Sequence, residues 1–185
     1  QPGEPLGAFT EALLADPQSL QALSLLNSGG FDPNSRAAHA AEIGGAGGIT
    51  KPRGLAGMYA PLANGGAQNG LRLVDAAHLA RMGQVAMAIH EDATLLIPTR
   101  LALGFRKSMD TRRRRSADRD SVLLGEAAFG HVGMGGSIGF ADPAEGLAFG
   151  YTMNRMGRGI LVNERGQSLI DAAYRALGHT SNHGG

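Results

Sequence analysis

The most prominent chemical pattern in the sequence is a glycine-rich stretch, GHVGMGGSIGFADP, at residues 130–143. Inside it, residues 135–139 match the G-x-S-x-G pattern of a hydrolase nucleophile elbow, with Ser137 as the nucleophile. Asp171 and His179 follow Ser137 in the chain order of such a catalytic triad. One candidate chemistry is therefore acyl transfer by a serine within this stretch.

The context of Ser137 argues against that assignment. A nucleophile elbow needs a helix directly after the serine, whereas residues 138–143 have the composition of a strand and a turn. Asp171 lies in an expected terminal helix, and His179 begins an expected frayed tail. Because five of the seven residues in 133–139 are Gly or Ser, the pattern also arises easily from composition. We expect Ser137 to be a strand residue.

Metal and cofactor chemistry have little support in the sequence. There is no cysteine and no H-E-x-x-H pattern, and the two histidines that are four positions apart, His179 and His183, lie in the expected tail and not in a helix. The glycine-rich residues 44–48 lack the spacing of a phosphate-binding loop. We therefore expect no metal and no cofactor. The six scattered histidines are His39, His78, His90, His131, His179 and His183.

The charge balance does not favour nucleic acid or an anionic membrane as a partner. Seventeen basic and sixteen acidic residues give a formal net charge of +1. The basic run at residues 112–115 lies in a longer segment, 106–120, whose aspartates offset much of its charge. We interpret that segment as a solvated loop between strands, with a nucleic-acid or targeting patch as the alternative. No apolar run approaches the roughly 20 residues of a membrane span.

The first half of the chain is expected to be helical. An N-cap and proline at Asp16-Pro17 predict a helix to Leu26, and residues 32–41 a shorter one. Two further helices are expected. The first is capped by Thr50, and its apolar face consists of Leu55, Met58, Tyr59 and Leu62. The second follows a turn at Asn69-Gly70 and is capped by Asp75. It is expected to bury Leu79 and Met82.

After Thr94 the pattern indicates strands. Segments at 94–105, 122–133, 136–143 and 147–155 are extended in character, and residues 142–146 predict a hairpin turn. In the last segment small residues alternate with large ones, so one face would allow a helix or backbone to approach closely. A terminal helix is expected to bury Leu169, Ile170, Ala173 and Leu177.

These elements define an α+β fold. We expect a mainly helical part at residues 1–93, sheet strands and a terminal helix at 94–178, and a tail at 179–185. At 185 residues, the chain has the length of one domain.

The stretch AFGHVGMGGSIGFADPAEGLAFGYTMNRMG resembles the C-terminal signature of the serine beta-lactamase and penicillin-binding-protein superfamily. The resemblance is closest to its esterase-type hydrolases, in particular the actinobacterial lipase/esterase branch. The upstream segment SRAAHAAEIGGAGGITKPRGLAGMYAPLANGG is similar to the helical region between that family's second and third motifs. The three motifs are S-x-x-K, then Y-x-N or S-x-N, then K-T-G or H-x-G. The resemblance implies a three-layer α/β complete domain.

By this resemblance, residues 131–133 are the third motif. His131 would stand in place of the family's Lys or His, Gly133 would be the motif glycine, and the N–H of Met134 would help to hold the oxyanion. Gly135 would keep the strand edge open to a small ester or lactam substrate. The alternative for His131 is a histidine satisfied by hydrogen bonds at a strand end.

The first two motifs are absent from these residues. The only lysines are Lys51 and Lys107, and the residues three positions before them are Gly48 and Gly104, so S-x-x-K is missing. No Tyr or Ser has Asn two places later, so Y-x-N and S-x-N are missing too. The sequence thus predicts the C-terminal portion of a serine hydrolase, a carboxylesterase, lipase or beta-lactamase-like enzyme, that forms an acyl-enzyme. Its nucleophile would lie on missing sequence or a partner chain. Without that part, we expect an exposed apolar sheet face.

The alternative from a different class is a catalytically inactive, truncated relative that acts as a binding or interaction module. The absence of the first two motifs favours this alternative for the chain taken alone.

Overall fold

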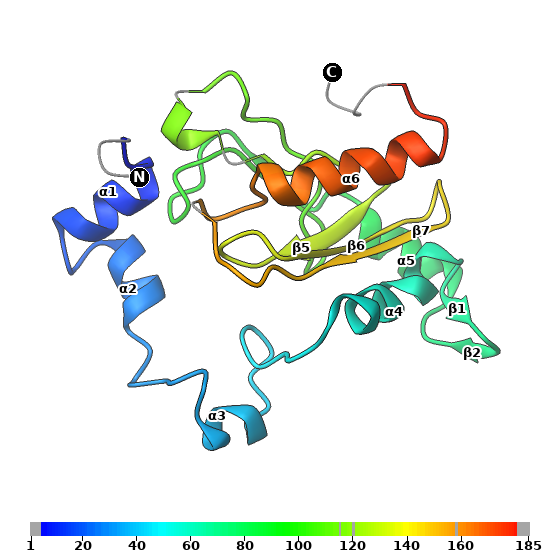
Figure 1. The fold of residues 1–185 in the computed structure, drawn as a ribbon, viewed down its shortest axis with the longest axis horizontal. Helices are drawn as coiled ribbons and strands as arrows, with labels where there is room; N and C mark the ends of the chain where they lie inside the picture. Colours follow the sequence, from blue (N-terminus) through cyan, green and yellow to red (C-terminus); the bar gives the residue numbers. More distant parts are fainter. Residues whose placement is uncertain (1–4, 115, 120, 158, 181–185) are drawn as a thin grey trace.

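The computed structural model describes residues 5–114, 116–119, 121–157 and 159–180. Helices dominate its first part, antiparallel strands follow, and a helix ends it (Figure 1). The predicted α+β class and order of elements are therefore confirmed. The helices are α1 (Ala8–Ala15), α2 (Leu20–Leu26), α3 (Arg36–Ala40), α4 (Pro52–Ala63), α5 (Ala76–Gly83), a 3-10 turn (Ser116–Asp118) and α6 (Glu164–Ala176). The strands are β1 (Ala67–Gln68), β2 (Leu71–Arg72), β3 (Met87–Ile89), β4 (Thr99–Leu101), β5 (Phe129–Val132), β6 (Ile138–Asp142) and β7 (Leu147–Tyr151).

The central sheet is an antiparallel meander with the order β5-β6-β7. His131 is opposite Gly139 in the first pair, and Gly139 is opposite Gly150 in the second. The hairpin turn predicted at residues 142–146 connects β6 to β7. On the other side, Arg106 bridges Leu101 of β4 and Gly130 of β5, and so joins the β3-β4 pair to the meander. Strands β4 to β7 lie within the segments predicted to be extended, whereas β3 precedes Thr94 and was not predicted.

Helix α4 covers one face of this sheet at very short range (Figure 1). A Cβ added to Gly150 would lie 2.5 Å from the carbonyl oxygen of Pro52, and one added to Gly139 would lie 2.5 Å from Cε2 of Tyr59. The absence of side chains at these two positions therefore permits the contact. This confirms the close approach predicted from the small residues of the last strand.

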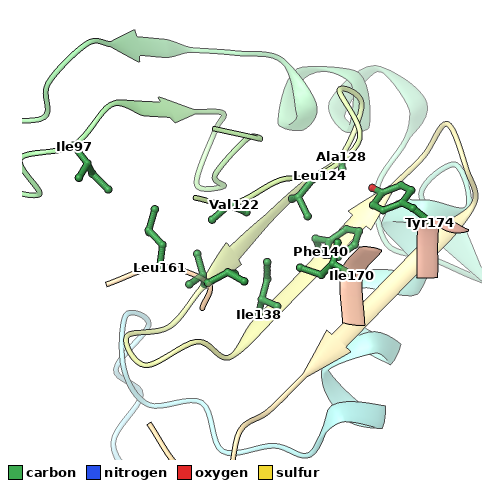
Figure 2. Packing of buried hydrophobic residues seen from close by; sticks show 11 residues of the cluster. Ile97, Val122, Leu124, Ala128, Ile138, Phe140, Leu161, Ile170 and Tyr174 are labelled. Atoms are coloured by element: carbon green, nitrogen blue, oxygen red, sulfur yellow. The ribbon is translucent and has the colours of Figure 1, made fainter. Parts of the chain in front are cut away.

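Helix α6 covers the opposite face through large side chains (Figure 2). Phe140 is fully buried there and stacks on Phe149 and Tyr174, with ring centroids 5.2 and 6.2 Å apart. The helix places Ile170 and Tyr174 on the strands, four residues apart on one helical face. Leu169 and Leu177, predicted to be buried, are each 48% exposed. The prediction was right for Ile170 and wrong for the two leucines, because the buried face of α6 also contains Gly166 and Tyr174.

Three helix starts or faces also differ from expectation. Helix α2 begins after Ser19, whose side chain accepts from the Ala22 N–H, rather than after Asp16. Asp16 instead ends α1, a helix that the sequence analysis did not identify. Helix α4 begins after Lys51, without a side-chain cap from Thr50. Met58 on this helix is exposed and not part of its buried face.

The expected exposed apolar sheet face is found at β3, where Met87 and Ile89 are 40% and 44% exposed, whereas α4 and α6 cover the two sides of the central strands. The large apolar side chains that remain exposed include several on α1 and α2, namely Leu14, Leu20, Leu23, Leu25 and Leu26. The segment 106–120 is less solvated than expected, since Lys107, Thr111 and Asp118 are buried within it. In the parts of the chain that the structure describes, every helix is too short or too polar to cross a membrane.

The close contact between α4 and the sheet predicts opposite effects for two Gly→Ala substitutions. Gly150→Ala should destabilise the fold by about 1–3 kcal/mol, because the methyl group would meet the backbone of α4. Gly57→Ala on α4 itself should stabilise it by about 0.5–1 kcal/mol, because its surroundings are open and alanine favours helix. Urea denaturation measures both. Equal effects would show that α4 does not lie on the glycine face.

Candidate active site edge

The candidate site lies at the end of β5, where the strand's outer edge becomes free. Gly130 exchanges two backbone hydrogen bonds with Arg106 on that edge, whereas the Gly133 N–H donates inward to the Ser137 carbonyl. Because backbone groups alternate between the two edges of an antiparallel strand, the Met134 N–H faces outward. It makes no hydrogen bond with the residues that the structure describes. An outward N–H of this kind can donate to a carbonyl oxygen.

His131 lies on the same stretch of strand, with its ring fixed to the backbone. Its Nδ1 is 2.9 Å from the Val132 carbonyl oxygen. Because a carbonyl only accepts, Nδ1 carries the hydrogen and the neutral ring presents Nε2 as an acceptor. Although His131 is exposed at the strand surface, desolvation by the atoms around its ring lowers its pKa, the bond to Val132 partly raises it, and the nearby Arg106 charge lowers it further.

Tyr59 packs against this part of β5 from the face of the sheet that α4 covers. Its ring is buried beside Gly139, the residue paired with His131. Burial raises the pKa of the Tyr59 hydroxyl, and a hydrogen bond from the backbone N–H of His131 partly opposes that increase. The tyrosine is thus a neutral group that packs under the histidine's backbone.

Residues 133–136 form a tight turn after β5. The Gly136 N–H donates to the Gly133 carbonyl over 3.1 Å, and Gly135 has φ +90°. A positive φ at the third position is the signature of a type II turn and favours glycine. The turn places Met134 at its exposed second position, directly beyond His131.

Asn163 holds this turn against the start of α6. Its Nδ2 donates to the Gly135 carbonyl over 2.8 Å, while its Oδ1 accepts from the Gly166 N–H and caps the helix. Gly136 and Gly157 leave space for the amide, since a Cβ at either would lie within 2.3 Å of Nδ2. The sequence analysis did not identify Asn163, although its position one residue before α6 marked it as a cap.

Ser137 has a structural role, because it joins the residue before β6 to the segment that follows β7. Its hydroxyl donates to the Met153 sulfur at 3.1 Å and accepts from the Met153 N–H at 3.2 Å. Asp171 accepts from Gln167, and His179 pairs with Glu145 at 3.1 Å, so the three residues of the apparent triad belong to separate clusters. The strand expected after Ser137 is present, and the elbow is excluded.

Metal ligands do not gather at this edge. Among the residues that the structure describes, no three His, Cys, Asp or Glu side chains form a group able to hold a metal ion.

Comparison with known proteins places the chain in a family. The model of the Beta-lactamase family matches residues 8–173. The chain belongs to the beta-lactamase family. A curated relative, the esterase/beta-lactamase LipL of Mycobacterium tuberculosis, is 35% identical over 116 residues, which cover 63% of this chain and 24% of LipL.

Three solved structures are also similar to this beta-lactamase family chain. A family VIII carboxylesterase is 39% identical with a TM-score of 0.64, covering 77% of this chain and 36% of that one. A penicillin-binding protein homolog from Caulobacter crescentus is 28% identical with a TM-score of 0.58, covering 69% and 32%. EstA from Arthrobacter nitroguajacolicus shares the fold, with 24% identity, a TM-score of 0.71 and coverage of 96% and 44%. The chain spans less than half the length of each of these relatives.

The His131 environment predicts a low titration midpoint for this ring. We expect NMR to show a pKa below 6.5 and the Nδ1–H tautomer in the neutral form, because burial and Arg106 disfavour the imidazolium. Since the folded pKa is lowered, the contribution of His131 to stability is complete above about pH 6.5 and declines as the pH falls towards the folded pKa. Arg106→Gln should raise the midpoint. An unchanged midpoint would remove Arg106 from the explanation.

The two hydrogen bonds of Asn163 can be separated by substitution. Asn163→Asp keeps an oxygen for the helix cap but loses the donor to Gly135, whereas Asn163→Ala loses both. The Asp variant should cost about 1 kcal/mol and the Ala variant about 2 kcal/mol. Amide hydrogen exchange should accelerate at residues 135–136 in both. Asn154→Asp, an exposed change of the same charge, serves as the control.

Proposed function

We propose that these residues form the C-terminal part of one beta-lactamase-like domain and supply the oxyanion-side edge of a serine esterase site. The observation that carries the proposal is the outward Met134 N–H next to a ring-fixed His131 on the edge of β5. Such an arrangement suits a carbonyl whose oxygen gains negative charge during attack, since a preorganised N–H stabilises that charge. The family membership and the names of the relatives support a serine hydrolase.

The proposed reaction is acyl transfer to a serine that the chain does not contain. A serine activated by a neighbouring lysine attacks the ester carbonyl, the alcohol leaves with a proton, and water then releases the acid. In this scheme His131 accepts or relays a proton through Nε2 near the carbonyl. Gly133 and Gly135 keep the edge free of side chains, and S-x-x-K comes from sequence beyond these residues or from a partner chain.

The names of the relatives support a preference for esters over lactams. The family VIII carboxylesterase is 39% identical to this chain, and LipL, which is named an esterase/beta-lactamase, is 35% identical. The penicillin-binding protein homolog is less similar, at 28%. We therefore infer a small carboxylic ester as the substrate and a beta-lactam as the secondary one.

Reconstitution tests this proposal. The chain would be fused behind the portion of a related esterase that carries S-x-x-K and Y-x-N, and turnover of a chromogenic short-chain ester and a chromogenic cephalosporin measured. Ester turnover should appear in the fusion and be absent from either part alone. His131→Ala should lower kcat/KM at least about 100-fold, whereas the exposed His78→Ala should not change it.

The Met134 N–H can be removed within the same fusion. Met134→Pro deletes the donor at a turn position that favours proline, so kcat should fall about 100-fold with the turn intact. Met134→Ala keeps the N–H and serves as the control. Ser137→Ala should retain turnover within a few-fold. Loss of turnover in Ser137→Ala alone would favour the elbow, and a correctly folded but inert fusion would favour a binding module.

A further inference from the structure

Two Asn-Gly pairs lie close together after α4, at Asn64-Gly65 and Asn69-Gly70. In such a pair the backbone nitrogen of the glycine can attack the side-chain carbonyl carbon of the asparagine, because glycine has no side chain that hinders the approach. Both asparagines are exposed, and a Cβ added to either glycine would meet no heavy atom within 4 Å apart from its chain neighbours. The two pairs therefore have the same composition and similar access to water, and they differ in what holds each asparagine.

Asn69 occupies the tip of the β1-β2 hairpin, which projects beyond the end of α4 (Figure 1). Gln68 pairs with Leu71, so Asn69 and Gly70 form a two-residue turn. Their φ angles of +50° and +79° fit a type I′ turn, in which asparagine followed by glycine is preferred. Among the described residues, neither the Asn69 side chain nor the Gly70 N–H has a hydrogen-bond partner.

The hairpin offers little resistance to opening at its tip. Each of its strands has two residues, and both residues of β2 are exposed. A two-stranded ladder of this length is marginally stable in water. Its base is held, because the Leu73 N–H donates to the Gly66 carbonyl over 2.8 Å. Rotation is therefore easiest at the tip, where the Gly70 nitrogen can reach Cγ of Asn69.

Asn64 is held at the end of α4 by several hydrogen bonds. It is the C-cap residue of that helix, and its backbone N–H donates to the carbonyls of Ala60 and Pro61. Its Nδ2 donates to the Ala60 carbonyl over 2.9 Å and to Oε1 of Gln68 over 3.1 Å. Attack by the Gly65 nitrogen requires the side chain to leave both acceptors, so this pair should react more slowly.

We propose that Asn69 is a site of spontaneous chemical modification in the folded chain, and that Asn64 is protected from the same reaction. The Gly70 nitrogen forms a bond to Cγ of Asn69 and gives up its proton to Nδ2, which leaves as ammonia. The result is a five-membered succinimide ring. Water, the only co-reactant, then opens the ring at one of its two carbonyls and produces aspartate or isoaspartate. This inference is independent of the proposed function.

The two products have different consequences for the hairpin. Aspartate keeps the two-residue loop, because Asp-Gly also favours a type I′ turn. Isoaspartate routes the main chain through the former side chain and adds one backbone carbon, so the pairing of Gln68 with Leu71 should be lost. The modified chain therefore carries two distinguishable end products at one turn.

Incubation of the full chain at mildly alkaline pH, with and without urea, tests this inference. Peptide mapping by mass spectrometry detects the gain of about 1 Da at each Asn-Gly pair and separates aspartate from isoaspartate. In the folded chain Asn69 should react at least about tenfold faster than Asn64, which must first break two hydrogen bonds. In urea the two rates should agree within about twofold. Equal rates in the folded chain, faster reaction of Asn64 or an unreactive Asn69 would overturn the inference.

Substitutions separate the effect of the hydrogen bonds from that of the local sequence. Gln68→Ala removes one of the two acceptors of the Asn64 amide and should accelerate the reaction at Asn64 about threefold. Gln84→Ala, an exposed change of the same kind after α5, is the control. Asn69→Gln keeps a side-chain amide but would have to close a six-membered ring, so the reaction at this position should cease on the same timescale. An unchanged rate at Asn64 in Gln68→Ala would contradict the proposed protection.

Discussion

The structure depends on the packing of α4 against the glycines of the central sheet. This contact is possible because these strand positions carry no side chains. Gly139 and Gly150 face each other across β6 and β7; the backbone of α4 lies where a Gly150 side chain would be, and the side chains of Tyr59 and Leu55 lie where a Gly139 side chain would be. This brings the buried Tyr59 under β5, at the residue opposite Gly139. A methyl group on either glycine would therefore disturb the support of His131 as well as the helix position.

The opposite face of the sheet packs against α6 through large side chains, whereas the α4 face packs closely at glycines. Phe140 and Tyr174 separate α6 from the strands, and Asn163 at the start of that helix reaches back to Gly135. The turn after β5 is consequently held from the α6 side, while the strand before it is supported from the α4 side. His131 and the Met134 N–H lie where these two supports meet. Their relative position is thus determined by both layers.

The sequence was sufficient to predict the strands, the hairpin and the small face of β7, because each is a local pattern with a clear physical cause. Residues 142–146 specify a turn, and alternating glycine and phenylalanine specify a two-faced strand. The functions of Ser137 and Asn163 were not predictable in this way. Their partners are 16 and 28 residues distant in the chain, and only the folded sheet brings them together.

The same distinction explains the errors in the helices. Ser19 caps α2 where Asp16 was expected, since both are good capping residues and only the path of the chain decides between them. In α6 the leucines suggested a buried face, yet a glycine, an isoleucine and a tyrosine at Gly166, Ile170 and Tyr174 occupy it. Tyr174 is preferred inside because its hydroxyl bonds to the buried Asp142 over 2.7 Å.

The groups of the candidate site are held in position by local contacts. The turn at 133–136, the tautomer of His131 and the outward Met134 N–H are all maintained by contacts within these residues. Under the proposed function, a segment that brings a serine and a lysine would meet a carbonyl-binding edge that is already formed, and would need to order only its own groups. The proposed oxyanion side would then be ordered independently of the nucleophile, because its groups are held by contacts among residues of β5, the turn at 133–136 and the start of α6.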